Sequence, residues 1–174
     1  MRQNRSWILI LAALTALTAM MLAQDKKPLS PPGTASFTFA DGRKVTIDYS
    51  RPSMRNRKIF GGLVPYDQVW RTGANAATSL RTDVDLNIGG ATVPKGSYTL
   101  YTLPGMSSWQ LIINKQTGQW GTEYDQAQDL ARVPMKVTQR PSGLETFTIS
   151  FDSAAMLKLE WDNTIASVDV QEKK

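Results

Sequence analysis

Two stretches of the sequence concentrate side chains that could bind a ligand. The first, residues 51–77, contains Arg51, Arg57 and Arg71, and the planar guanidinium group suits carboxylate, sulfate or phosphate. Trp70 and Asn75 add an aromatic face and an amide. This combination predicts a surface for a small polar or anionic ligand, such as a glycan or an envelope component. The alternative is a solvated loop in which the cations pair with surface acids, Trp70 fills the core and Asn75 caps a turn.

The second stretch, residues 116–129, supplies further aromatic side chains. Trp120 and Tyr124 are predicted to stack on the same ligand, and Asn114, just before the stretch, is predicted to add an amide hydrogen bond. The alternative for the aromatic residues is a small core that the loop builds for itself. Whether the two stretches meet in space decides whether a single site exists.

Three carboxylates also lie in the second stretch, at Glu123, Asp125 and Asp129. A second hypothesis takes Glu123 or Asp125 as the acid–base residue of a hydrolase or lyase that acts on a polysaccharide. Calcium binding is a further use of such oxygen ligands, but the spacing matches no EF-hand. The competing interpretation pairs these carboxylates with arginines as part of the structure.

The residue types that the chain lacks exclude several classes of catalytic and metal site. The 174 residues include neither cysteine nor histidine. Thiol nucleophiles, disulfides, Ser-His-Asp relays and nearly all zinc and copper sites are therefore excluded. No Gly-rich phosphate loop and no Gly-x-Ser-x-Gly motif is present. We therefore assign no catalytic residue, no cofactor and no metal, and a non-enzymatic binding module is the first hypothesis.

The N-terminus has the pattern of an export signal. Arg2 and Arg5 precede an uncharged, mostly apolar run from Trp7 to Leu22, and cleavage is expected after Ala23. An uncleaved anchor is the alternative. The pattern predicts a periplasmic or extracellular protein with no stable membrane span after cleavage.

Removal of the signal changes the charge balance. The formal charge of the chain is +5, from 20 Lys and Arg and 15 Asp and Glu, and loss of the two signal arginines leaves 18 − 15 = +3. This small excess, in an exported protein, argues against a nucleic-acid partner.

The rest of the chain alternates between apolar and polar residues, as strands do. A hairpin is predicted around Asp41-Gly42, and one strand over Leu80–Ile88. Pro134 predicts an edge strand over residues 131–137, because proline cannot donate to a strand ladder. Asp162-Asn163 is predicted as the last turn.

These patterns predict an all-β fold of nine or ten short strands without an amphipathic helix. The expected architecture is an antiparallel β-sandwich or jelly-roll-like barrel, with two long irregular loops. The expected organisation is a signal peptide over residues 1–23, a flexible tether over 24–34 and a single domain over 35–174. A third hypothesis for function is a structural or interaction protein that uses a sheet edge; the oligomeric state is left open.

The irregular stretches also carry a family resemblance, which covers about residues 35–170. The sequence resembles the domain-of-unknown-function family 2911. The segments that carry the resemblance are Arg51-Pro52-Ser53, residues 57–66 (RKIFGGLVPY), residues 69–75 (VWRTGAN), residues 94–100 (PKGSYTL), Asn114-Lys115 and residues 119–125 (QWGTEYD). The resemblance implies an exported bacterial protein with a signal peptide. It implies no established activity and supplies no catalytic residue.

Overall fold

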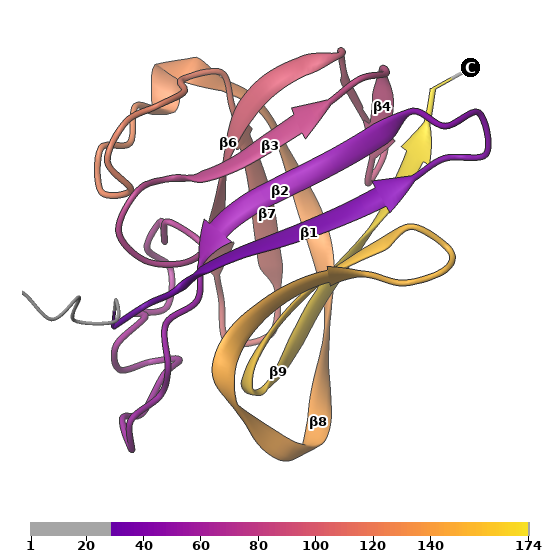
Figure 1. Cartoon of the computed structure of the whole chain (residues 1–174). Coiled ribbons are helices and arrows are strands. Elements are labelled where there is room, and N and C mark those ends of the chain that lie inside the picture. The colour runs from indigo at the N-terminus through magenta and orange to yellow at the C-terminus, as the bar shows by residue number, and fades with distance from the viewer. Residues whose placement is uncertain (1–28, 174) are drawn as a thin grey trace, which may run out of the picture.

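A computed structural model describes residues 29–173 and confirms the predicted all-β fold (Figure 1). The predicted signal peptide lies outside the described residues. The elements are β1 (Pro32–Thr38), β2 (Lys44–Ser50), β3 (Thr78–Thr82), β4 (Leu86–Ile88), β5 (Ala91–Val93), β6 (Gly96–Pro104), β7 (Trp109–Asn114), the 3₁₀-helix η1 (Gln126–Gln128), β8 (Asp129–Phe151) and β9 (Met156–Glu172).

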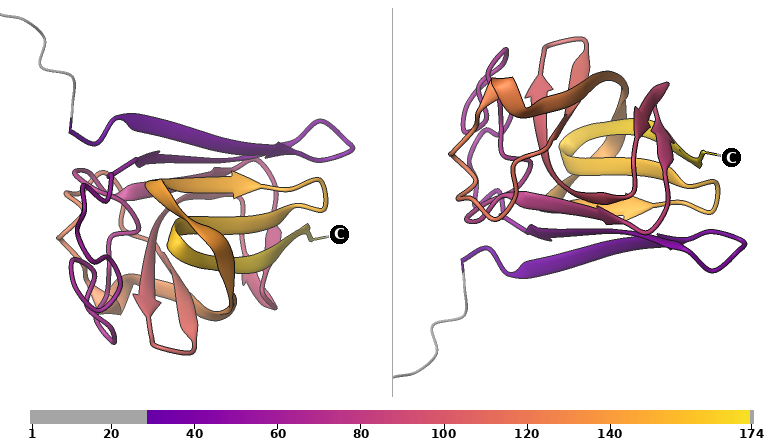
Figure 2. Two further views of the ribbon diagram at one scale, coloured as in Figure 1. Left: turned by 90° about the horizontal axis from the view of Figure 1, so that it is seen from below. Right: turned by 90° about the horizontal axis from the view of Figure 1, so that it is seen from above.

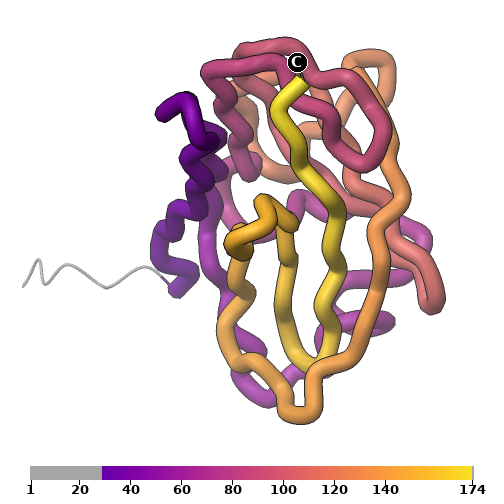
Figure 3. Tube along the Cα trace, turned by 90° about the vertical axis from the view of Figure 1, so that its right-hand side faces the viewer, coloured from indigo at the N-terminus to yellow at the C-terminus, as the bar shows by residue number. Residues whose placement is uncertain are grey.

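The strands form one antiparallel, unclosed sheet that is folded over on itself. Its order is β1-β2-β3-β6-β7-β8-β9-β4-β5. The sheet folds over at β8 and β9, because both strands run down the molecule, bend together and return (Figure 3). The returning half of β8 then lies beside β1 and β2 (Figure 2), where Phe37 contacts Phe151 with ring centroids 6.2 Å apart. This arrangement gives the sandwich-like architecture that the sequence predicts.

The first hairpin forms as predicted, but the strand predicted over Leu80–Ile88 divides into β3 and β4. β3 pairs with β2 and β6, whereas β4 pairs with β5 and β9. The break has a local cause, because the Thr82 hydroxyl donates to the carbonyl of Val84 at 2.6 Å and accepts from its N–H at 3.2 Å. Such side-chain bonds compete with the strand ladder. Burial still alternates across the break, so the periodicity is real although one continuous strand was wrong.

The last turn also differs from the prediction. The chain bends at Asp162-Asn163, where Asp162 has a φ of 51°. The ladder with β8 nevertheless continues on both sides of the bend, from Leu157 to Ser167. One bent strand, β9, therefore replaces the two predicted strands and their turn.

At Pro134, β8 is paired with a neighbouring strand on one side only. Pro134 faces Gln110 of β7, and the ladder between β8 and β9 begins only at Lys136. The missing N–H of the proline therefore breaks no bond of that ladder. The predicted edge strand over residues 131–137 is nevertheless wrong, because β8 lies between β7 and β9 in the sheet and pairs with β9 from Lys136 onward.

The part of the core at the bend of the sheet is a cluster of aromatic side chains. Trp161, from β9, is buried and stacks on Trp70 at 5.9 Å and 18°. Phe147 of β8 contacts both indole rings edge-on or tilted, and Phe60 contacts both edge-on. The irregular stretch 51–77 thus supplies part of the core.

The N-terminal end of the described chain is held by specific contacts. β1 begins at Pro32, inside the predicted tether, and pairs there with Ser50. The carbonyl of Leu29 accepts a hydrogen bond from Arg55 Nη2 at 2.9 Å. Among residues 29–173, no helix has the length and apolar character needed to cross a membrane.

Candidate ligand-binding site

The stretch 51–77 follows the sheet without joining it as a strand. Isolated bridges fix it at Ser53–Thr146, Phe60–Val64, Trp70–Thr102 and Ala76–Trp120. Many of its residues adopt left-handed backbone conformations, which for residues other than glycine cost energy and cluster at functional sites. They are Arg55, Asn56, Asp67, Thr72 and Asn75.

Thr72 is the most informative of these, because it is β-branched, buried and has a φ of 53°. Its hydroxyl donates to Thr102 Oγ1 at 3.1 Å, and its carbonyl accepts from Thr78 Oγ1 at 2.8 Å. These bonds hold a strained residue between Arg71 and Gly73. The backbone that carries Arg71 into the site is therefore anchored on its C-terminal side.

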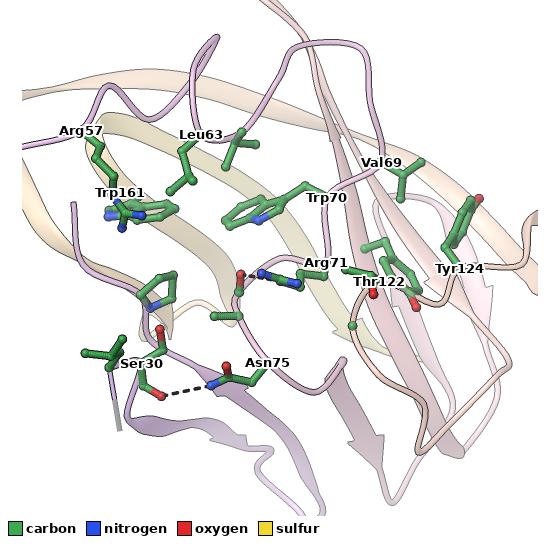
Figure 4. A pocket seen from close by; sticks show the side chains of 17 residues that line it. Ser30, Arg57, Leu63, Val69, Trp70, Arg71, Asn75, Thr122, Tyr124 and Trp161 are labelled. Atoms are coloured by element: carbon green, nitrogen blue, oxygen red, sulfur yellow. Dashed lines mark hydrogen bonds between the residues drawn. The ribbon is translucent and has the colours of Figure 1, made fainter. Parts of the chain in front are cut away.

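The two irregular stretches converge. Gly121 N–H donates to the carbonyl of Asn75 at 3.1 Å, beside the bridge between Ala76 and Trp120. Between the stretches lies a cavity of about 490 Å³ (Figure 4). Its lining comprises Leu29, Ser30, Pro52, Arg57, Leu63, Val64, Val69, Trp70, Arg71, Gly73, Ala74, Asn75, Tyr101, Gly121, Thr122, Tyr124 and Trp161. The volume falls in the range of small-molecule sites.

The charge of the cavity wall is positive. Arg57 and Arg71 both line it, and the lining within residues 29–173 includes no aspartate or glutamate. Arg71 donates from Nε to the carbonyl of Gly73 at 3.4 Å, and neither Nη atom has a hydrogen-bond partner in this part of the chain. Arg57 spends Nε and Nη2 on the carbonyls of Met54 and Ser53. Arg71 therefore has more guanidinium N–H groups available to a ligand than Arg57 has.

The cavity has a mostly apolar side and a polar side. In Figure 4, Leu63 and the rings of Trp70 and Trp161 lie on one side, with Arg57 beside Trp161, and Ser30 and Asn75 lie on the other. The Arg71 guanidinium lies between the two sides. Asn75 Nδ2 donates to the carbonyl of Ser30 at 3.5 Å. A bound anion could therefore contact Arg71 while its apolar part contacts the tryptophan side.

Tyr124 contributes its ring to the cavity, while its hydroxyl has structural partners. The hydroxyl donates to Asp129 Oδ2 at 2.6 Å and accepts from Arg132 Nη2 at 2.6 Å. Burial, followed by the hydrogen bond to Asp129, raises the pKa of Tyr124 to about 12. The phenol is therefore neutral at physiological pH and is a weaker acid than an ordinary tyrosine.

The remaining predicted ligand-binding residues lie outside the cavity lining. Arg51 donates to Thr148 Oγ1 at 3.2 Å and so fastens the stretch to β8. Asn114 is buried, and its Nδ2 donates to the carbonyl of Asp125 and to Asp129 Oδ1, both at 2.9 Å. Trp120 is 52% exposed but does not line the cavity.

Two of the three carboxylates of the second stretch, Asp125 and Asp129, have structural partners, whereas Glu123 is exposed and lies outside the cavity lining. Asp125 Oδ1 accepts from Ala127 N–H at 2.9 Å and caps η1. Asp129 forms an ion pair with Arg132 at 2.9 Å. Among residues 29–173, no group of acidic side chains is arranged to hold a metal ion. The interpretation of Asp125 and Asp129 as structural acids thus fits their contacts.

Sequence reasoning assigned no role to three residues that shape the cavity. Gly121 lies so close to Arg71 that an added Cβ would be 2.7 Å from Arg71 Cδ. Leu63 forms part of the wall, and Trp161 arrives from a strand nearly 100 positions later in the chain than Leu63. Gly121 and Leu63 fall within the family-like segments, but nothing in the local pattern shows that they face a cavity.

The fold and the site define an all-β protein with a cationic, partly apolar pocket between two loops. The chain belongs to the DUF2911 family of proteins of unknown function, whose model matches residues 30–170. No curated protein and no solved structure shows a significant match to the chain.

Proposed function

We propose that the protein is an exported, non-enzymatic module that binds a small anionic ligand in the cavity between residues 51–77 and 116–129. The observation that carries the proposal is the Arg71 guanidinium, whose Nη donors have no hydrogen-bond partner and face a cavity without acidic lining in the described chain. An anion on this fork would gain charge-assisted hydrogen bonds that water otherwise supplies. The N-terminal sequence pattern supports the export part of the proposal.

The roles of the predicted residues are refined accordingly. Arg71 is the primary anion-binding side chain, and Arg57 adds positive potential at the wall. Trp70 and Tyr124 provide ring surface, and Asn75 a polar edge. Arg51 and Asn114 are proposed to act indirectly, by holding the two loops in place.

A polysaccharide hydrolase finds less support than the binding module. Such an enzyme needs two carboxyl groups about 5–9.5 Å apart across a cleft. Within residues 29–173, the cavity lining contains no carboxylate, and Asp125 and Asp129 are held by Ala127, Asn114 and Arg132.

The proposal is tested by calorimetric titration of the full chain, as the cell produces it, with benzoate, glucuronate and inorganic phosphate. Benzamide and glucose are the neutral counterparts. At least one anion should bind, its neutral counterpart should not, and Arg71→Gln should weaken binding about tenfold or more, since a charged hydrogen bond is worth about 1.5–3 kcal/mol.

The matched control is Arg81→Gln, an exposed arginine on β3 that pairs with Asp48 at 3.7 Å and does not line the cavity. This variant should bind as the wild type does. Failure of all three anions to bind, or equal weakening by both variants, would refute an Arg71-centred anion site.

A further inference from the structure

The apolar side chains of the cavity indicate what kind of anion it can bind. Leu29 is 72% exposed and Leu63 is 46% exposed, and both lie in the cavity wall. Large aliphatic side chains that are left open to solvent at a pocket favour a ligand with an apolar body. Val64 and Trp70 extend the same surface inward.

The supply of hydrogen-bond acceptors points the same way. Sugar hydroxyls donate protons, so a saccharide site needs acceptor oxygens, which carboxylates supply best. The cavity lining offers no carboxylate among residues 29–173. The carbonyl oxygens of Gly73 and Asn75 already accept from Arg71 and Gly121. A polyhydroxylated ligand would therefore have to place its donors on neutral acceptors, such as the side-chain oxygens of Ser30, Asn75 and Thr122, which are weaker than carboxylates.

The donors of Arg71 suit a single carboxylate head group, and Arg57 adds a second positive charge to the wall. Arg71 provides one planar fork, which a carboxylate engages through two parallel hydrogen bonds. Arg57, with Nε and Nη2 bound to backbone carbonyls, leaves one terminal nitrogen without a hydrogen-bond partner within residues 29–173. Figure 4 shows Arg71 between the apolar and polar sides, so a head group held there has apolar surface on one flank.

We propose that the cavity binds an amphipathic monocarboxylate, with the carboxylate on Arg71 and an alkyl body against Trp70, Leu63 and Val64. This inference rests on the proposed anion-binding function and names its ligand class. Binding involves no covalent step. Apolar contact supplies affinity in proportion to the buried area, and Arg71 selects the anion over the alcohol.

The probes are hexanoate, octanoate and decanoate, each below the concentration at which it forms micelles, with octanol and glucuronate for comparison. Affinity, measured calorimetrically with the full chain, should rise about fourfold for each added methylene that is buried. Octanol should bind more weakly than octanoate by about tenfold or more, and glucuronate should bind more weakly still.

Two pairs of variants separate the head group from the body. Arg71→Gln should remove the preference for octanoate over octanol, whereas Arg81→Gln should not. Leu63→Ser should weaken decanoate more than hexanoate, because the longer chain reaches more of the wall. Met106→Ser is its control, since Met106 is also exposed but lies outside the cavity lining. Thermal unfolding of each variant, measured without ligand, establishes that it is folded.

The outcomes distinguish this inference from the proposed function. If glucuronate or phosphate binds in an Arg71-dependent manner and the alkyl carboxylates show no gain with chain length, the amphipathic ligand is wrong and the anion site stands. If octanol binds as well as octanoate, the charge-selective alkyl site is wrong. If no anion of any kind binds, both proposals fail.

Discussion

Within residues 29–173, Arg71 is positioned by steric and backbone constraints and not by an acidic partner. Its stem lies against Gly121, and its backbone is followed by Thr72, which buried hydroxyl bonds hold in a strained conformation. A salt bridge at this position would neutralise the guanidinium and block it. Positioning by glycine and strain leaves the charge available to a ligand, at a cost of about 1–3 kcal/mol for the strained residue.

Gly121→Ala tests this positioning directly. An added Cβ would lie 2.7 Å from Arg71 Cδ and 2.7 Å from the carbonyl oxygen of Asn75. Because the oxygen belongs to the backbone, the loop itself must shift, and we expect a loss of about 1–3 kcal/mol in stability together with weaker anion binding. Urea unfolding and calorimetry measure the two effects.

Gly105→Ala is the matched control, since its Cβ would come within 2.5 Å of the carbonyl oxygen of Ser108, in a turn outside the cavity lining. It should lower stability without changing the affinity of the folded protein. Wild-type affinity in the Gly121→Ala variant would contradict the proposed role of the glycine.

The Tyr124 hydroxyl makes stability depend on alkaline pH. Its folded-state pKa of about 12 lies above the ordinary tyrosine value of 10.0, so the folded protein holds the proton more tightly than the unfolded chain. The resulting stabilisation is fully present below pH 10 and is lost as the pH rises toward about 12.

Tyr124→Phe should therefore destabilise the protein by about 1–3 kcal/mol near neutral pH, where it removes the bonds to Asp129 and Arg132. The difference from the wild type should shrink as the pH rises from 10 to about 12, because the variant lacks the titrating group. Urea unfolding at a series of pH values measures this difference, and a constant difference would show that Tyr124 titrates normally.

At the scale of elements, β9 is distinctive because it bends without ending. Asp162 takes up the bend with a φ of 51°, while pairing with β8 continues before and after it. The bend brings Trp161 under Trp70, so it contributes to the cavity wall as well as to the core.

Asp162→Val should destabilise the protein by about 1–2 kcal/mol, because a β-branched residue is strained at positive φ. Asp162→Gly should be tolerated, since glycine adopts this conformation without strain. Ser167→Val is the control in the extended part of β9, where valine suits the strand. Thermal and urea unfolding compare the three variants, and equal stability of the two Asp162 variants would refute strain as the cause.

At the scale of the whole molecule, Tyr49 joins β2 to the part of β8 that returns over it. The Tyr49 hydroxyl, on β2, donates to the carbonyl of Ile149 at 3.3 Å and accepts from its N–H at 2.8 Å. These bonds link β2 to the returning half of β8. Arg51 makes a second link nearby, through Thr148.

Tyr49→Phe should lower the free energy of unfolding by about 1–3 kcal/mol, because it leaves both backbone groups of Ile149 unpaired in a buried region. Hydrogen exchange should accelerate most in residues 147–151, if the link holds this half of β8 to β2. Tyr66→Phe is a comparison at a partly buried tyrosine, and a uniform change in exchange across the sheet would contradict a local link.

The alternation of apolar and polar residues predicts much of the fold, because the periodicity of a strand is a local property of the sequence. It predicts the first hairpin, the burial pattern around residues 80–88 and the all-β class. It misses the break between β3 and β4, since that break depends on the Thr82 hydroxyl. It also reads Asp162-Asn163 as a chain reversal, because the same turn-forming residues serve equally well in a bent strand.

The sequence by itself determined the strand-rich class and the export pattern. Because it contains neither histidine nor cysteine, it also limited the groups available to a site to side chains such as arginine, aromatic residues and amides. Tertiary structure alone decided which of these groups share a cavity. Arg71, Trp70 and Tyr124 meet there, whereas Asn114 and Arg51 are turned to structural partners. The physical reason is that a ligand site depends on contacts between residues far apart in the chain, here Leu63, Gly121 and Trp161, and local pattern contains no record of such distances.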